Sequence, residues 1–220
     1  MIRDRKLKGD AIIKWSPNFA YAIGLIATDG CLGRDGAYID LTSKDLEQIN
    51  NFKKCLGITA KIGYKISGSG HISRRIQFRN EEFYSFLVGI GLTPSKSKTI
   101  GKVKVPKQYF FDFLRGSFDG DGTFYSYLDK RWKSSFMFYT EFICASQDHI
   151  NWIRETINEN LEVTGHVTTN SNNICKQLKY AKSDSLKVLR KMYYSPNVIC
   201  LSRKRLKINK ILAMIGEKTL

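Results

Sequence analysis

The sequence predicts an α+β protein of two pseudo-symmetric halves, each with helices packed on an antiparallel sheet. A pattern of small and apolar residues that ends in Asp-Gly occurs at 22–30 and again at 114–122. The residues that follow the two copies are also similar, and segments of alternating polarity separate segments with helical periodicity. A repeat of this length indicates two related half-domains and not a solenoid.

The first repeated segment belongs to a predicted helix from Pro17 to Thr28. Ser16 is a good N-cap residue, and Pro17 suits the first helical position, where its missing N–H costs no hydrogen bond. Gly30 ends the helix, because glycine tolerates the backbone conformations that follow a helix C-terminus. The second copy, at 114–122, predicts an equivalent helix.

Strands are predicted after each of these helices. Residues 36–43 alternate between apolar and polar side chains, and 57–66 with 71–79 have the pattern of a hairpin around Gly68 and Gly70. The second half offers equivalent strands at 134–146, 163–169 and 174–182. One face of each sheet would pack on the helices, and the other, rich in basic, tyrosine and amide side chains, would lie on a charged ligand.

Two further pairs of similar segments complete the repeat. Residues 42–56 resemble 145–161, and 78–94 resemble 180–196. The first of these pairs predicts a short turn into an amphipathic helix. The predicted order in each half is helix, strand, strand, helix, strand, strand, helix. We assign residues 1–97 to the first half, 98–110 to a lysine-rich linker that contains Pro106, and 111–220 to the second half.

The chain is strongly basic. Its 220 residues include 36 Lys and Arg against 20 Asp and Glu, which gives a formal net charge of +16. Basic residues lie among apolar and aromatic ones, as at 74–79, 102–107 and 203–210, so the charge belongs to a folded surface. This distribution favours double-stranded DNA as the partner, although a ribosome-associated protein or a binder of membrane surfaces would share the charge.

Cysteine and histidine usage argues against a zinc site. The five cysteines are odd in number, widely spaced and without a CxxC pair, and the three histidines do not cluster with them. Any metal would therefore have oxygen ligands. The first residues lack an apolar signal core, and no apolar stretch approaches the roughly 20 residues of a membrane span. We expect a soluble intracellular protein without a membrane partner, in the cytoplasm of a prokaryote or in an organelle.

Small residues four apart form a stripe on each repeated helix. Gly24 and Thr28 form it on the first helix, and Gly116 and Gly120 form it on the second. Small side chains at this spacing let two helix backbones approach closely. We therefore expect the two helices to pack on each other.

Asp29 and Asp121 would then lie side by side at the ends of these helices. A carboxylate at a helix C-terminus opposes the helix dipole, and two neighbouring carboxylates repel each other. A divalent cation such as Mg²⁺ would offset both effects, since it binds few carboxylates together with water and phosphate oxygens. The pair predicts metal-dependent phosphoryl chemistry, whereas one Asp-Gly alone would indicate a helix cap.

Both repeated segments resemble the LAGLIDADG motif, and FLRGSFDGDGTF at 113–124 is close to its usual form. The resemblance covers the whole chain and implies two αββαββα half-domains whose sheets form a saddle on DNA. It implies a monomeric homing endonuclease that makes a metal-dependent double-strand break in a long, asymmetric target. It also implies that Asp29 and Asp121 bind Mg²⁺ or Mn²⁺, with the carbonyls of Thr28 and Gly120 as backbone ligands.

The first motif departs from the family pattern at one position. Ala27 stands where Asp119 stands in the second copy. In the family this position usually holds the less essential of the two acids, so the departure does not remove the expected activity.

The resemblance also implies a catalytic lysine in each half. Lys204 is the matching position in the second half. Lys98 is our choice in the first half, where Lys96 fits nearly as well. A polar residue that positions water would fall on Ser43 and Ser146, which follow strands. Each lysine could instead contact phosphate or be a solvated surface charge.

DNA bases would be read in the major groove by strand side chains on the polar sheet faces. In the first half these are Arg34, Tyr38, Arg74, Arg75, Gln77 and Arg79. In the second half they are Tyr125, Lys133, Tyr139, Lys176, Gln177 and Lys179. Arginine pairs well with guanine and glutamine with adenine, while lysine mostly contacts phosphate. Because the halves differ, one chain should read an asymmetric site as a pseudo-dimer, so we expect a monomer that requires no protein partner.

Other functions compete with this prediction. The main alternative is a non-cleaving nucleic-acid-binding protein of the same fold, such as an intron maturase or a DNA-binding regulator; such regulators generally lose the acids. Maturase activity could also coexist with cleavage. An intein-derived endonuclease is disfavoured because the sequence begins with Met1 and lacks splice-junction residues, so an intron-encoded product is expected. A ribosomal protein that is basic by composition alone would leave the repeated Asp-Gly helices unexplained.

Overall fold

A computed structural model gives the fold and describes residues 11, 13–68, 70–129, 136–169 and 175–220. The elements of the first half are α1 (Pro17–Thr28), β1 (Gly30–Leu32), β2 (Tyr38–Ser43), α2 (Leu46–Leu56), β3 (Ile62–Ile66), β4 (Ile72–Arg79) and α3 (Glu81–Gly89). Two short 3₁₀ helices follow, η1 (Lys96–Lys98) and η2 (Lys107–Tyr109). The order of helices and strands is the predicted one.

The second half repeats this order and adds a helix. Its elements are α4 (Phe110–Gly120), β5 (Thr123–Leu128), β6 (Phe136–Cys144), α5 (Gln147–Leu161), β7 (His166–Thr169), β8 (Lys176–Ala181), α6 (Lys182–Met192) and α7 (Ser202–Met214). α7 has no equivalent in the predicted order. The division of the chain at residues 97 and 110 stays a prediction.

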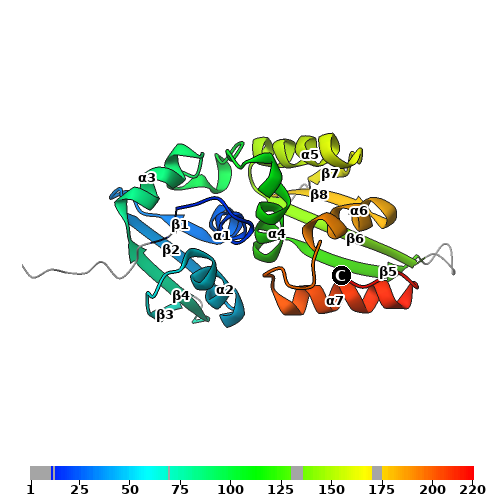
Figure 1. The fold of residues 1–220 in the computed structure, drawn as a ribbon, viewed down its shortest axis with the longest axis horizontal. Coiled ribbons are helices and arrows are strands. Elements are labelled where there is room, and N and C mark those ends of the chain that lie inside the picture. Colours follow the sequence, from blue (N-terminus) through cyan, green and yellow to red (C-terminus); the bar gives the residue numbers. More distant parts are fainter. Residues whose placement is uncertain (1–10, 12, 69, 130–135, 170–174) are drawn as a thin grey trace, which may run out of the picture.

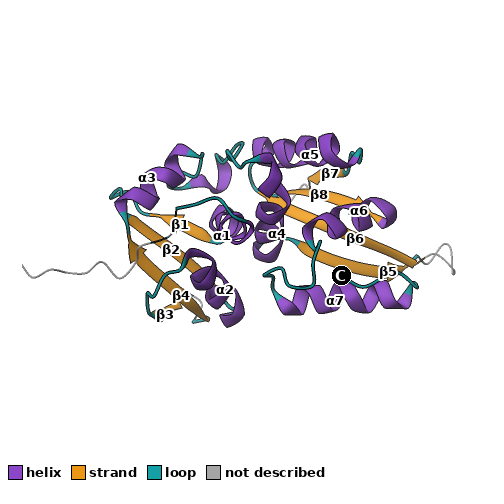
Figure 2. Ribbon diagram, in the orientation of Figure 1, coloured by secondary structure: helices purple, strands orange, loops and turns teal. Residues whose placement is uncertain are grey.

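Each half contains one four-stranded antiparallel sheet, and the strand orders β1-β2-β4-β3 and β5-β6-β8-β7 are equivalent (Figure 2). In the central pair of the first sheet, Ile39 lies opposite Phe78 and Leu41 opposite Ile76. These four side chains are buried in the core. Because side chains alternate along a strand, the residues between them form a second, polar face. The predicted α+β class with two antiparallel sheets is confirmed.

Local sequence signals set the limits of α1. The Ser16 hydroxyl accepts a hydrogen bond from the Phe19 amide at 3.1 Å, and Pro17 occupies the first helical position, as predicted. The residues from Phe19 to Ile26 are all buried, so α1 is a central helix without a solvent face over this stretch. The helix ends at Asp29, whose amide still donates to a helical carbonyl.

α1 and α4 lie side by side at the centre of the molecule, with one sheet on either side (Figure 1). A Cβ added to Gly24 would lie 2.1 Å from the Phe113 carbonyl oxygen, and one added to Gly116 would lie 2.0 Å from the Tyr21 carbonyl oxygen. No larger side chain fits between the two backbones. The small residues four apart therefore permit the close helix packing that the sequence predicts.

Two apolar cores flank this pair of helices. The first core includes Phe52 and the second includes Phe142. Phe113 of α4 packs into the first core, and Trp152 of α5 borders both cores. The two halves therefore share buried surface. Over the residues described above, the structure has no helix with the length and apolar character needed to cross a membrane.

Candidate functional site

Asp29 and Asp121 are the C-cap residues of α1 and α4, so the two helices carry them to the same end of the helix interface. A Cβ added to Gly120 would lie 2.0 Å from the Thr28 hydroxyl oxygen and 3.2 Å from an Asp29 carboxylate oxygen. The Asp29 carboxylate thus lies beside the backbone of the residue before Asp121. The structure brings these four residues together.

Burial and a neighbouring carboxylate disfavour the charged form of Asp29, and burial disfavours that of Asp121. Burial, followed by the nearby charge of Asp121, raises the pKa of Asp29 to about 6. Partial burial also raises the pKa of Asp121, although Lys204 and Lys96 oppose this shift. The protein therefore holds two carboxylates whose ionised forms are incompletely stabilised.

Gln48, in the first turn of α2, holds the Asp29 carboxylate. Its side-chain N–H donates to Asp29 Oδ2 at 2.6 Å, and its Oε1 accepts from the Ser43 hydroxyl at 2.9 Å. The side chain is almost fully buried. Our sequence analysis missed Gln48. The available signal was a polar residue on the helix stripe that also contains buried Phe52 and Leu56.

Ser43 and Ser146, predicted to position water, make different contacts in the two halves. Ser43 reaches Asp29 indirectly, through Gln48. Ser146 is the N-cap of α5, and its hydroxyl accepts from a backbone amide of that helix. The same hydroxyl donates to the carbonyl of Ile100. Ser146 therefore fixes the segment between the halves.

Lys96 and Lys204 occupy equivalent places in the two halves. Nζ of Lys96 donates to the carbonyl of Gly30, and Nζ of Lys204 donates to the carbonyl of Gly122 at 2.6 Å. Each of these glycines directly follows one of the aspartates. Both lysines are buried, and burial lowers the pKa of each, that of Lys204 to about 8. Each half therefore supplies one buried cation close to the carboxylates.

Lys98, our choice from the sequence for the first-half lysine, is exposed. It lies in the same 3₁₀ helix as Lys96, where three residues complete one turn, so the two side chains point in different directions. The structure places Lys96 and not Lys98 beside the carboxylates. We therefore reassign the proposed role to Lys96.

Asp119 links three helices. Its Oδ2 accepts from the Tyr21 hydroxyl of α1 at 2.8 Å and from the Leu201 amide at 2.6 Å. Burial raises the pKa of Asp119 to about 6. Because Leu201 is the N-cap of α7, these bonds join α4 both to α1 and to the helix that carries Lys204. Our sequence analysis did not predict this structural role.

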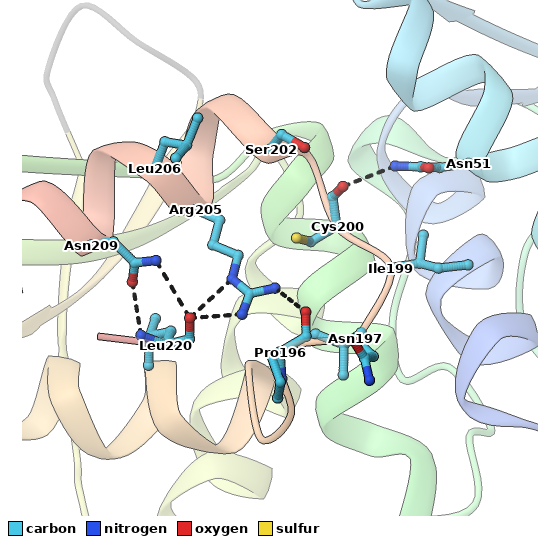
Figure 3. Close-up of a pocket in the computed structure, with 11 residues that line it drawn as sticks. Asn51, Pro196, Asn197, Ile199, Cys200, Ser202, Arg205, Leu206, Asn209 and Leu220 are labelled. Atoms are coloured by element: carbon cyan, nitrogen blue, oxygen red, sulfur yellow. Dashed lines mark hydrogen bonds between the residues drawn. The ribbon is translucent and has the colours of Figure 1, made fainter. Parts of the chain in front are cut away.

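Residues of both halves fix the segment that leads into α7 (Figure 3). Asn51 of α2 donates to the Cys200 carbonyl at 2.9 Å. Glu47 of α2 accepts from both the amide and the hydroxyl of Ser202, the first residue of α7. The first half thus helps to set the position of Lys204 in the second half.

The donor set suits a hard divalent cation. Asp29 and Asp121 offer carboxylate oxygens next to the backbone of Thr28 and Gly120. Within the described ranges, no group of three or more His, Cys, Asp or Glu side chains is arranged to hold a metal ion. A cation here would take water and phosphate oxygens as its remaining ligands, as Mg²⁺ does. A pocket lined by Thr28, Ser97 and Asp121 leaves room for them.

Four of the predicted first-half DNA contacts share the polar face of their sheet, namely Tyr38, Arg75, Gln77 and Arg79. Asp40 is buried within this face and accepts hydrogen bonds from Arg75 and, at 3.2 Å, from Gln77. This carboxylate fixes the Arg75 guanidinium before any ligand binds. Arg34 is exposed in the turn that follows β1.

The polar face of the second sheet carries Tyr125, Tyr139, Gln177 and Lys179. The rings of Tyr125 and Tyr139 stack with centroids 5.2 Å apart. Lys179 lies 3.9 Å from Glu141, a buried carboxylate near the centre of the face. Lys133 lies outside the described residues. The two faces are equivalent in position but different in chemistry.

Arg74 and Lys176 lie on the opposite faces of their sheets. Arg74 is paired with Ser43 across the strands and lies over the Tyr64 ring, 4.6 Å from its centroid, while Lys176 is paired with Cys144. Arg74 comes directly before Arg75, and Lys176 directly before Gln177, and both following residues lie on the polar face. Neighbouring residues in a strand point to opposite faces. The prediction that these two residues share the polar face is therefore wrong.

Two αββαββα halves, paired through central helices that each end in an aspartate, define the two-domain LAGLIDADG fold. Neither a family model nor a curated protein matches the sequence. The LAGLIDADG homing endonuclease I-LtrWI, bound to target DNA, is similar with a TM-score of 0.60 and 14% identity over 91% of each chain.

Two other solved structures support this fold. The homing endonuclease I-DmoI, in complex with DNA and Mn, has a TM-score of 0.53 and 14% identity over 81% of this chain and 97% of its own. Full-length DUF199/WhiA from Thermatoga maritima has a TM-score of 0.54 and 12% identity over 93% of this chain and 68% of its own. At such identities the similarity establishes the fold alone.

Proposed function

We propose that this chain is a site-specific homing endonuclease that makes a metal-dependent double-strand break in a long, asymmetric DNA target. The observation that carries the proposal is the pair of carboxylates at the meeting ends of α1 and α4. Burial and the charge of Asp121 raise the pKa of Asp29 to about 6. When no cation is bound, such a pair of carboxylates destabilises the fold. The same pair provides good ligands for a divalent cation.

The residues around the pair suit phosphodiester hydrolysis. Mg²⁺ or Mn²⁺, held by Asp29, Asp121 and neighbouring backbone carbonyls, would supply Lewis-acid charge for an in-line displacement. In that reaction water adds to phosphorus, one phosphorus–oxygen ester bond breaks, and the departing oxygen takes up a proton. Lys96 and Lys204 each hold a positive charge on backbone carbonyls beside the carboxylates, where it would offset the growing charge on a phosphate oxygen.

Double-stranded DNA would lie across the polar faces of both sheets. The formal net charge of +16 supports binding to the phosphate backbone. Arg75 and Gln77 of the first face, and Gln177 of the second, have donors suited to base edges in the major groove. Since one chain provides both faces, we propose a monomer that acts as a pseudo-dimer and is encoded within an intron.

A DNA-binding protein that does not cleave is the second candidate. Lys96 and Lys204 already donate to backbone carbonyls at the ends of α1 and α4, and a purely structural role as helix caps would explain these bonds. That role gives no reason for two carboxylates with raised pKa values beside them, so cleavage is the better proposal.

Plasmid cleavage separates the two candidates. The substrate carries the sequence that flanks the gene, joined without the intron, and is incubated with Mg²⁺ or with EDTA. We expect one double-strand cut that requires Mg²⁺. Asp29→Asn and Asp121→Asn should each abolish the double-strand cut and leave the Kd for DNA within about twofold, because neither change alters the sheet faces. Tight binding by the wild-type protein without any cut would overturn the proposal and support the second candidate.

A further inference from the structure

The first turns of α2 and α5 are equivalent in the fold but contact different partners. Counted from the N-caps Asp45 and Ser146, the third helical residue is Gln48 in α2 and His149 in α5. The two side chains are 2% and 4% exposed, respectively. Both therefore point into the molecule from equivalent places.

Gln48 holds Asp29 with its amide fixed in one orientation. Ser43 Oγ accepts from the Asp45 amide at 3.1 Å and donates to Gln48 Oε1 at 2.9 Å. Because Oε1 accepts this bond, the amide N–H group is directed to Asp29 Oδ2, 2.6 Å away. The bond fixes one carboxylate oxygen and leaves the other available to a ligand.

His149 makes no equivalent contact with Asp121. Its Nδ1 lies 2.7 Å from the carbonyl oxygen of Gly101, and its ring packs against Trp152. Across the part of the chain that the structure describes, no side chain donates a hydrogen bond to Asp121; its charged neighbours act on it only through space. Asp121 is partly exposed and lines the same pocket as Thr28.

We propose that Gln48 is a positioning residue that makes the two cleavage centres unequal. It orients Asp29 before DNA binds, whereas Asp121 is oriented by its ligands alone. This inference rests on the proposed nuclease function. Without Gln48, the strand whose cleavage depends on Asp29 is cut slowly and the other strand is cut normally, so the variant nicks its target.

Strand-resolved cleavage tests this proposal. A duplex target with a different fluorophore on each strand is cut under single-turnover conditions with Mg²⁺. In Gln48→Ala we expect one strand to slow on the order of tenfold to a hundredfold, as misplaced catalytic groups do, while the other stays within about twofold. Supercoiled plasmid should accumulate as nicked circles. Ser43→Ala keeps Gln48 but frees its amide, so it should slow the same strand by a smaller factor.

Asn151→Ala is the matched control. Asn151 lies in α5, is exposed and accepts a hydrogen bond from Gln147 at the helix surface. This variant should cut both strands as the wild-type protein does. Equal slowing of both strands in Gln48→Ala, or cleavage at the wild-type rate, would overturn the proposal. Should Gln48→Ala fail to fold, as seen by thermal unfolding, Ser43→Ala provides the same comparison.

A second measurement keeps this inference separate from the proposed function. If the wild-type protein binds DNA but does not cut, the nuclease proposal fails, and electron paramagnetic resonance of Mn²⁺ in the DNA complex tests the positioning of Asp29. Weaker Mn²⁺ binding in Gln48→Ala than in Asn151→Ala would support a role of Gln48 in orienting Asp29. Equal Mn²⁺ binding in the two variants would overturn it.

Discussion

Lys96 and Lys204 share one local geometry, since each ammonium group donates to the carbonyl of the glycine after an aspartate. A lysine near a helix C-terminus is stabilised by the helix dipole, and the charge also lowers the repulsion between the two carboxylates. Burial lowers the pKa of both amino groups, so neither is a typical surface lysine. Lys98, two positions from Lys96, is exposed.

This contrast predicts different effects of two nearly identical substitutions. Lys96→Met should slow single-turnover cleavage by about tenfold or more, because it removes a positive charge beside the proposed reaction centre, and should weaken DNA binding much less. Lys98→Met removes an exposed charge and should change the cleavage rate by no more than about twofold. Cleavage rates and Kd values for the same duplex provide the measurement. Similar losses of cleavage in both variants would show that Lys96 has no special role.

Some of the candidate site was predictable at the level of single residues. The repeated motif identified Asp29 and Asp121, because duplication distinguishes a functional pair from ordinary helix caps. Gln48 was not predictable in its role, since its partner Asp29 lies 19 residues away and only the packing of α2 on α1 brings them together. Arg74 was misplaced for a different reason, because strict strand alternation already forbids it from sharing a face with Arg75.

Elements were predicted best where short-range signals define them. α1 begins and ends at the predicted residues. Ser16 and Pro17 set its start, and Gly30 lets the chain turn close against the helix, since a Cβ there would lie 2.6 Å from Cα of Ile26. α7 was not predicted because five residues of its sequence, SRKRLKINKILAM, are basic, and its buried residues Lys204, Ile208, Ile211 and Leu212 include a lysine. A buried lysine interrupts the apolar periodicity by which a helix is identified from sequence.

His149, in the first turn of α5, makes the stability of the fold depend on pH. His149 is buried with its Nδ1 at the Gly101 carbonyl, and burial lowers its pKa to about 4, with a contribution from Lys96. Histidine in an unfolded chain has a pKa of about 6.5. Since the folded state binds the proton more weakly, the stabilisation is complete above pH about 6.5 and is lost as the pH falls towards 4.

His149→Gln should remove this dependence, because glutamine can donate to the same carbonyl but does not titrate. Between pH 7 and pH 4, the free energy of unfolding of the wild-type protein should fall by up to about 3 kcal/mol relative to the variant. Urea unfolding of both proteins at several pH values measures this difference in the free energy of unfolding. The titrations of Asp29 and Asp119 cancel in it, because both proteins contain these residues. A difference that stays constant with pH would contradict the prediction.

At the scale of the whole molecule, the two halves are joined by several independent sets of contacts. Phe113 of the second half packs in the core of the first, and the α1 and α4 backbones touch. Away from this interface, Asp45 forms an ion pair with Arg203 at 2.8 Å, and Glu47 accepts hydrogen bonds from Ser202. The sequence repeat predicted the two halves, but these connections depend on side chains that differ between the copies and could not be inferred from it.

Because the halves share buried surface, we expect the chain to unfold in one cooperative transition. Far-ultraviolet circular dichroism reports both halves, while the fluorescence of Trp15 and Trp152 depends on packing around the first core and between the two cores. The two signals should change at the same urea concentration. Separate midpoints would show that the halves unfold independently and that their shared core contributes little.

Glu47→Ala tests how far the first half stabilises α7, which has no side-chain cap of its own. Loss of this acceptor leaves the Ser202 amide without its carboxylate partner, so the free energy of unfolding should fall by about 0.5–2 kcal/mol, as when an N-cap residue is removed. Glu155→Ala, an exposed change on α5, should alter it by less than about 0.5 kcal/mol. Because α7 carries Lys204, Glu47→Ala should also slow cleavage more than it weakens DNA binding. Equal stability of the two variants would show that α7 is held by the second half alone.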